Sequence, residues 1–292
     1  PGTLMYECCL HTLRIYLLRM GWVGEQGQVA YQSVPGVCGK LKCRGQVIAS
    51  TRTVRYQISI VKTDFMDDGT PYAIANALMF ADGHPIVEMH NMSLSLHGLR
   101  REHIEALWHS APGVAAQASQ LPRQTVSTVQ GASATALFDQ ASILAYAEGR
   151  PSDGFGERYR MFDEQRVLAR LPRPPYLFMD QVDRIVGCEQ WQLSAGGEIE
   201  STHQITPQDW YFAANRQHAV PLAILMEIAL QPCGWLAAYL GSALTSETDL
   251  SFRNLDGQAT LHRALSADSG LLRAKTRINK VSSSGGMIIQ SY

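Results

Sequence analysis

The sequence has no excess of charge of either sign. Its 292 residues contain 25 Lys and Arg against 26 Asp and Glu, which gives a formal net charge of −1. A protein with nearly balanced charge has no overall field that attracts a polyanion. The composition therefore argues against nucleic acid as a partner.

Cysteine pairs that hold metals and long apolar runs are also missing. None of the six cysteines forms a CxxC pair or another zinc-ligand spacing; they are Cys8, Cys9, Cys38, Cys43, Cys188 and Cys233. No run approaches the roughly 18 consecutive apolar residues of a membrane span, and the N-terminus does not have the pattern of a secretory signal. We therefore expect free thiols in a soluble cytoplasmic protein, with no bound metal and no membrane partner.

The length and the hydrophobic content favour two domains. At 292 residues, of which 46% are hydrophobic, the chain can fill two cores of ordinary size. Residues 109–135 are rich in Ala, Ser, Gln and Thr without a hydrophobic period, which is typical of a linker. We predict a first unit at 1–108, a linker with a short helix at 109–164, and a second unit at 165–292.

Hydrophobic spacing predicts one long helix followed by strands. Residues 1–21 have the pattern of a largely buried helix whose buried face carries Leu4, Leu10, Leu13, Leu17 and Leu18. Strand patterns follow at 46–51, 52–63, 72–80 and 86–98. A further strand is expected within 171–187. A long helix followed by an antiparallel meander predicts an α+β fold.

An internal repeat supports two copies of one unit. In each copy a proline is followed six residues later by a glutamate, and four residues further on by an imidazole or an amide side chain. The repeated residues are Pro1, Glu7 and His11 in the first copy and Pro221, Glu227 and Gln231 in the second. Flanking segments correspond as well: 42–47 with 252–259, and 54–62 with 272–280.

The two glutamates are the candidate catalytic residues. Burial disfavours the charged form of a carboxyl group, so that a glutamate in an apolar helix becomes neutral or binds a partner. A spacing of four residues puts His11 over Glu7, and Gln231 over Glu227, where each can orient the carboxyl group. The alternative is a glutamate that only hydrogen-bonds nearby backbone.

The start of each helix is a candidate binding site for the carbonyl group of a substrate. The first amides of a helix have no partner within it and can polarise a carbonyl oxygen. The residues concerned are Gly2 and Thr3 in the first copy and Pro221 and Leu222 in the second.

Three segments resemble FabA-like 3-hydroxyacyl-acyl-carrier-protein dehydratases. PGTLMYECCLHTLRIYLL at 1–18 resembles the central helix of that family, and LPRPPYLFMDQVDRIVG at 171–187 resembles its first strand. The stretch DWYFAANRQHAVPLAILMEIALQPCGWLAAYLGS at 209–242 resembles the approach to the central helix and the helix itself. Within the family, the tandem dehydratase region of polyunsaturated fatty acid synthases is the most similar.

The resemblance implies a double hot-dog fold, in which each of two long helices is wrapped by a curved antiparallel sheet. It also implies dehydration of 3-hydroxyacyl thioesters to 2-enoyl thioesters within a polyunsaturated fatty acid or polyketide synthase. In that family a histidine just before the Pro-Gly pair removes the α-proton, and the helix carboxyl group of the other unit protonates the leaving hydroxyl. No bound cofactor is expected, because the substrate arrives on the phosphopantetheine of an acyl carrier protein. Neighbouring synthase domains and a second copy of the chain are further expected partners.

The chain departs from the family at the histidine position. Asn215 stands there and cannot act as a base; His218 lies nearby as a possible replacement, and Leu222 stands where the family has glycine. The chain begins on Pro1, so we expect it to be a fragment whose first-unit histidine lies upstream. Under this assignment a site built from Asn215 and Glu7 lacks its base. A site built from Glu227, Gln231 and the upstream histidine is complete.

Two other functions remain open from the sequence. A hot-dog thioesterase would use the same scaffold to hydrolyse the thioester. A non-catalytic unit would only dock acyl carrier domains, and Asn215 and Leu222 favour that hypothesis.

Overall fold

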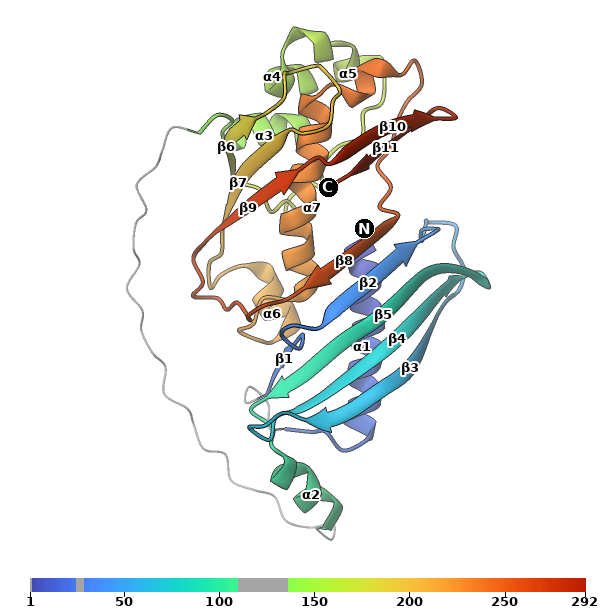
Figure 1. Ribbon diagram of the computed structural model, residues 1–292, viewed down its shortest axis with the longest axis vertical. Helices are drawn as coiled ribbons and strands as arrows, with labels where there is room; N and C mark the ends of the chain where they lie inside the picture. The colour runs from blue at the N-terminus through green and yellow to red at the C-terminus, as the bar shows by residue number, and fades with distance from the viewer. Residues whose placement is uncertain (1, 25–28, 110–135) are drawn as a thin grey trace. The chain divides into compact units, whose positions relative to one another are not determined.

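The structure is a computed structural model that describes residues 2–24, 29–109 and 136–292 (Figure 1). These residues form two compact units that alternate along the chain. Unit 1 comprises the described residues of 1–127 together with 207–223 and 254–268, and unit 2 comprises those of 128–206 together with 224–253 and 269–292. The predicted sequential division at 108 and 165 stays a prediction, and most of the predicted linker lies outside the described residues.

The fold is mixed α+β with antiparallel sheets, as the sequence pattern predicts. In unit 1 a six-stranded antiparallel sheet has the order β3-β4-β5-β2-β8, with β1 paired to β5. Figure 1 shows α1 lying along one face of β3, β4 and β5. The elements of this unit are α1 (Gly2–Arg19), β1 (Ala30–Gln32), β2 (Cys38–Cys43), β3 (Val54–Phe65), β4 (Pro71–Ala81), β5 (His84–His97), α2 (Arg101–His109), α6 (Trp210–Asn215) and β8 (Asp256–Thr260).

The core of unit 1 lies between α1 and the sheet. Along β4 the burial alternates strictly, as expected for a strand with one covered face. The covered face carries small side chains, with Ala73 and Ala75 at 0% exposure, which allow a helix to approach closely. From α1, the residues that this core buries include Leu10, Leu13 and Leu17.

The predicted buried face of the first helix is partly wrong. Leu4 and Leu18 are 43% and 41% exposed, whereas Leu10 is 3% exposed. At 100° per residue, Leu18 and Leu4 point about 80° and 120° around the helix from Leu10, outside the arc that the sheet covers. Ile15 is also 60% exposed, so the helix is buried along one stripe only.

The strand predicted at 46–51 is also wrong. Those residues form a loop in which Thr51 N donates to Ile48 O at 2.9 Å, and Ile48 N donates to Thr51 Oγ1 at 3.1 Å. The tight turn satisfies locally the backbone groups that a strand would pair with a neighbour. The strands expected at 52–63, 72–80 and 86–98 are present as β3, β4 and β5.

In unit 2 the helix α7 (Leu222–Tyr239), which enters this unit at Ile224, packs in an aromatic core. Trp235 of α7 is 0% exposed, and its ring centre lies 4.6 Å from that of Phe155 and 5.6 Å from that of Tyr146. Val182 and Ile199 close this core from a three-stranded antiparallel sheet of order β6-β7-β9. The remaining elements are α3 (Gln140–Ala147), α4 (Pro151–Phe155), η1 (Glu157–Tyr159), α5 (Met161–Glu164), β6 (Gln181–Val186), β7 (Glu198–Gln204), η2 (Ser242–Thr245), β9 (Leu271–Arg277), β10 (Lys280–Ser284) and β11 (Met287–Ser291), the last two forming a hairpin.

Among the described helices, α7 alone is long and apolar enough to cross a membrane, with a mean hydropathy of 1.4 over Leu222–Tyr239. Core helices of globular units pass the same test, and 56% of this window is buried inside the protein. The helix also carries Glu227 and Gln231, which are 5% and 3% exposed. Its composition is therefore weak evidence for a membrane span.

Candidate functional site

The carboxylate of Glu7 is the centre of a polar cluster in unit 1. Its Oε1 atom lies 3.0 Å from Nε2 of His11 and 3.4 Å from Nη1 of Arg14. Spacings of four and seven residues place both partners on the helix face of Glu7. The Glu7 side chain is 17% exposed and that of His11 is 56% exposed. The expected contact between Glu7 and His11 is therefore present, together with an ion pair that the sequence analysis did not predict.

Arg14 connects α1 to the end of α6. The residue is 9% exposed, and its Nη1 atom donates to Oδ1 of Asn215 at 3.1 Å. The guanidinium carbon lies 5.1 Å from the centre of the Tyr31 ring, in a cation–π contact. Burial lowers the pKa of Arg14, and the Glu7 carboxylate opposes that shift. Glu7 and Asn215, which the sequence analysis assigns to one site, thus contact the same guanidinium group.

Arg14 is the member of this cluster that sequence reasoning missed. A basic residue seven positions after an acid in an apolar helix was the available signal. That spacing places two side chains two turns apart on one face, where a charged pair can form.

Three side-chain atoms of this cluster are buried and have no hydrogen-bond partner among the described residues. They are Oε2 of Glu7, Nε of Arg14 and Nδ2 of Asn215. A cavity of about 10 Å³ lies beside Arg14 and is also lined by Pro221 and Leu222, two of the predicted binding residues. A space of that size admits one water-sized group.

The other predicted binding residues of unit 1 lie in different surroundings. Thr3 is 1% exposed, and a Cβ atom at Gly2 would lie 3.6 Å from Sγ of Cys43. His218 is exposed, and its carbonyl oxygen accepts from Ala267 N at 3.0 Å. Among the described residues no contact joins the imidazole of His218 to the carboxylate cluster. Its role as a replacement base stays a prediction.

Glu227 and Gln231 form the corresponding pair in unit 2, and both side chains are buried. Gln231 Nε2 donates to Glu227 Oε2 at 3.3 Å and to the carbonyl oxygen of Tyr176 at 2.9 Å. Its Oε1 atom accepts from the backbone N–H of Phe178 at 2.7 Å. The loop before β6 therefore fixes the orientation of the amide, and the amide in turn orients the carboxyl group of Glu227.

A buried histidine that the sequence analysis did not single out lies next to this loop. His203 of β7 is 8% exposed, and its ring packs against that of Phe178 with centres 5.6 Å apart. Its Nδ1 atom lies 3.3 Å from Oδ1 of Asp180, while Nε2 is buried without a hydrogen-bond partner in the described residues. The sequence analysis predicted no strand at this position, and a single histidine in a sequence is too common to indicate a site.

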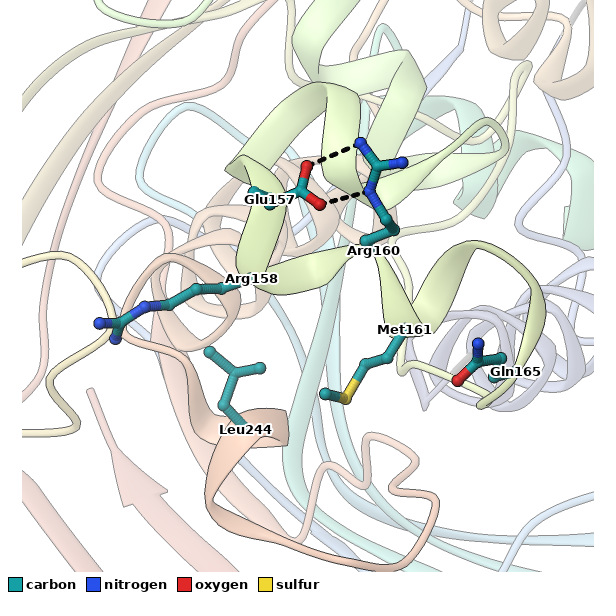
Figure 2. Close-up of a pocket in the computed structure, with 6 residues that line it drawn as sticks. All are labelled: Glu157, Arg158, Arg160, Met161, Gln165 and Leu244. Atoms are coloured by element: carbon teal, nitrogen blue, oxygen red, sulfur yellow. Dashed lines mark hydrogen bonds and ion pairs between the residues drawn. The ribbon is translucent and has the colours of Figure 1, made fainter.

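A hollow of about 520 Å³ on the described surface is lined by none of the predicted residues. Figure 2 shows that Glu157 and Arg160 pair with each other there through two contacts, one of them a hydrogen bond of 2.7 Å from Nη2 to Oε2. Met161 and Leu244 add apolar lining. Glu157 and Arg160 satisfy each other, and the guanidinium carbon of Arg158 lies 4.6 Å from the centre of the Trp191 ring. This hollow therefore offers less chemistry than the two glutamate sites.

Within the described parts of the chain, no three His, Cys, Asp or Glu side chains gather as they would around a metal ion. All six cysteines are free thiols, as expected from their spacing. Burial raises the pKa of Cys9, which is next to Cys8 and two positions from Glu7, to about 12. A thiol with so high a pKa is a poor nucleophile at neutral pH.

Comparison with known proteins agrees with the resemblance identified from the sequence. Residues 1–90 match the FabA-like domain family. One subunit of a polyunsaturated fatty acid synthase from Thraustochytrium sp. is 34% identical over 140 residues, which is 44% of this chain and 9% of that protein. The chain thus aligns with less than a tenth of the length of this relative. The resemblance to FabA-like domains and the distant similarity to a polyunsaturated fatty acid synthase are confirmed, and the family match ends before the predicted second unit.

Proposed function

We propose that this chain is part of a dehydratase that removes water from 3-hydroxyacyl thioesters within a polyunsaturated fatty acid or polyketide synthase. The observation that carries the proposal is the buried carboxyl group of Glu227, oriented by an amide that the backbone of Tyr176 and Phe178 holds in place. The FabA-like match of residues 1–90 supports the same reaction class. In this proposal both units are hot-dog units and together form a double hot-dog.

Glu227 is the general acid of the proposed reaction. Gln231 donates to Oε2 of Glu227 and thereby orients the carboxyl group. In its acid form, an oriented carboxyl group can give a proton to a leaving hydroxyl group. Gln231 is the positioning residue, since it acts on the substrate only through Glu227.

The elimination of water requires one base, which takes up a proton, and one acid, which donates a proton. The base removes the proton from C2 of the acyl chain, the bond between C3 and oxygen breaks, and the double bond forms between C2 and C3. Glu227 gives its proton to the departing hydroxyl group, which leaves as water. The base that we assign is the histidine that FabA-like domains carry before the Pro-Gly pair, a position that would precede Pro1.

The proposed dehydration also implies which partners the chain binds. The thioester is presented by the phosphopantetheine of an acyl carrier protein in the cytoplasm, and the dehydratase needs no bound cofactor because the thioester itself acidifies the α-proton. Neighbouring synthase domains and a second copy of the chain complete the proposed assembly.

The test uses a protein that contains this chain and extends upstream of Pro1. Hydration of crotonyl-pantetheine, the reverse reaction, is followed by loss of enoyl absorbance. Replacing Glu227 by Gln should lower kcat by about 100-fold or more, because a general acid contributes that much. Glu247→Gln, at an exposed loop position, should change kcat less than twofold.

Two outcomes contradict the proposal. Activity that survives Glu227→Gln but is lost with Glu7→Gln would assign the acid to the other unit. Release of free thiol from the thioester, without formation of an enoyl product, would indicate a thioesterase.

A further inference from the structure

His203 is a buried titratable residue to which the proposed reaction gives no role. It belongs to β7 and is 8% exposed, and its Nδ1 atom lies 3.3 Å from Oδ1 of Asp180. A carboxylate can only accept a hydrogen bond, so in the neutral imidazole the hydrogen sits on Nδ1 and Nε2 has a free lone pair. Nε2 has no hydrogen-bond partner among the described residues. The contact with Asp180 therefore orients the ring.

Asp180 is itself fixed against β7. Its Oδ2 atom accepts from Gln204 N at 2.6 Å, and its backbone N–H donates to Thr202 O at 2.9 Å. These two residues are the neighbours of His203 along the strand. The carboxylate thus has a defined place on β7, and so has the imidazole that bonds to it.

The imidazole ring supports the loop before β6. Its centre lies 5.6 Å from that of the Phe178 ring, and the two planes meet at 77°, which is the edge-to-face arrangement that aromatic rings favour. The Tyr176 ring contacts Phe178 as well, with centres 5.1 Å apart. Phe178 is 3% exposed, so that movement of its side chain requires movement of the rings packed against it.

The backbone of this loop holds the amide of Gln231. Phe178 N donates to Gln231 Oε1 at 2.7 Å. Nε2 of the same amide donates to Tyr176 O at 2.9 Å and to Glu227 Oε2 at 3.3 Å. Direct contacts therefore connect the His203 ring, through the loop, to the carboxyl group of Glu227.

We propose that His203, oriented by Asp180, is a positioning residue for the general acid Glu227. Its ring holds Phe178 where the backbone N–H of that residue can bind Gln231, and Gln231 then orients the carboxyl group that donates the proton. The role of Glu227 as the acid rests on the proposed function. The hold of His203 on the loop rests on the contacts alone.

The first experiment compares two substitutions at position 203 by hydration of crotonyl-pantetheine, in the protein that contains this chain and extends upstream of Pro1. His203→Leu fills a similar space without an aromatic ring. It should lower kcat about tenfold and change KM less than about twofold, because the acid is misplaced while the substrate still binds. His203→Phe keeps a ring against Phe178 but loses the bond to Asp180, so kcat should fall only about threefold.

Ile143→Ala is the matched control for loss of core packing. Ile143 is 0% exposed in the core of the same unit, and its truncation should lower the unfolding temperature. Below that temperature kcat should change less than about twofold. Thermal unfolding of every variant sets the temperature at which kcat is compared. An equal loss of kcat in Ile143→Ala and His203→Leu would overturn the inference, as would equal values for the Leu and Phe variants.

The double variant His203→Leu, Glu227→Gln shows whether His203 acts through the acid. If it does, the double variant should keep the residual kcat of Glu227→Gln within about twofold, because the misplaced group is already absent. A further tenfold loss would mean that the two residues act independently, contrary to the inference.

Hydrogen exchange in the 292-residue chain tests the hold on the loop without any activity. The Phe178 amide, which donates to Gln231, should exchange about threefold to tenfold faster in His203→Leu than in the unmodified protein. The Val182 amide, which donates to Phe138 O at 2.9 Å, is the internal reference and should change less than about twofold. Equal acceleration of both amides, or of neither, would overturn the inference. If the Phe178 amide responds as expected in a protein that does not hydrate crotonyl-pantetheine, the proposed function fails and the hold of His203 on the loop stands.

Discussion

Glu7 and Glu227 occupy equivalent places in two copies of one sequence pattern, but their side chains have different surroundings. Glu7 contacts a guanidinium, whereas Glu227 accepts a hydrogen bond from the neutral amide of Gln231. The difference follows from the residue seven positions after each acid. In the first copy it is Arg14, and in the second it is Gly234, where an added Cβ atom would lie 3.2 Å from the Leu171 side chain. A larger side chain at that position would have to displace Leu171 and Phe252.

Replacing Gln231 by Leu should destabilise unit 2. The change removes hydrogen bonds to Phe178 N, Tyr176 O and Glu227 Oε2, and each is expected to contribute about 1 kcal/mol. The free energy of unfolding measured with urea should fall by about 2–4 kcal/mol. Gln192→Leu, the same change at an exposed position, should alter it by less than about 0.5 kcal/mol. Similar values for the two variants would contradict the bonding described for Gln231.

At the scale of elements, the pairing of β2 with β8 joins segments more than 200 residues apart. Cys38 lies opposite Thr260 and Lys42 opposite Asp256. Beside this ladder, Arg44 and Asp256 form a two-pronged hydrogen-bonded pair at 2.8 and 3.2 Å. The sequence repeat relates 42–47 to 252–259, and these segments meet at the end of the ladder, where Lys42 lies opposite Asp256 and Cys43 N donates to Leu255 O at 2.6 Å. A repeat identifies such segments but does not reveal that they pair.

The ion pair of Arg44 and Asp256 should make the stability of unit 1 depend on pH. The hydrogen bond from Arg44 lowers the pKa of Asp256 in the folded protein. The ionised carboxylate therefore stabilises the fold at pH values above the unfolded pKa of about 4. This stabilisation is lost as the pH falls through the lower pKa of the folded protein. Asp256→Asn should lower the urea midpoint at pH 7, and the difference from the unmodified protein should shrink at pH 3. Both side chains are more than half exposed, so the effect should be small and weaken with salt.

Asp268→Asn, at an exposed position outside the pair, is the control and should leave the midpoint unchanged at either pH. A difference between Asp256→Asn and the unmodified protein that stays constant from pH 7 to pH 3 would argue against the ion pair.

At the scale of the whole molecule, two units have separate cores although each is assembled from stretches that alternate along the chain. Unit 1 is held by α1 against its sheet, and unit 2 by the aromatic cluster around Trp235 and Phe155. Separate cores predict that local damage stays local.

Phe155→Ala should loosen unit 2 and spare unit 1. Phe155 is 1% exposed, and truncating a buried aromatic side chain is expected to cost about 3–5 kcal/mol. Hydrogen exchange should accelerate in the amides of 136–206, 224–253 and 269–292. Leu13→Ala, at 0% exposure in unit 1, is the matched core truncation and should give the reverse pattern. Equal acceleration in both units would mean that they unfold as one.

The sequence by itself determined the local features of this protein. The alternation along 72–80 predicts β4, because a strand with one buried face repeats every two residues. The spacing of four residues predicts both the contact of Glu7 with His11 and that of Glu227 with Gln231, because helix geometry alone brings such residues together. The FabA-like motifs are likewise continuous stretches of sequence.

Only the tertiary structure decided which distant residues meet. Arg14 and Asn215 are 201 positions apart, and no periodicity relates them. Cys38 and Thr260 pair for a similar reason: the ladder depends on how the chain closes, and a strand pattern does not encode its neighbour. The exposure of Leu4 and Leu18 also depended on how much of the helix surface the sheet covers. Lengthening a loop adds little to the entropic cost of closing it, so a large separation along the chain does not prevent such contacts. No local sequence pattern marks them.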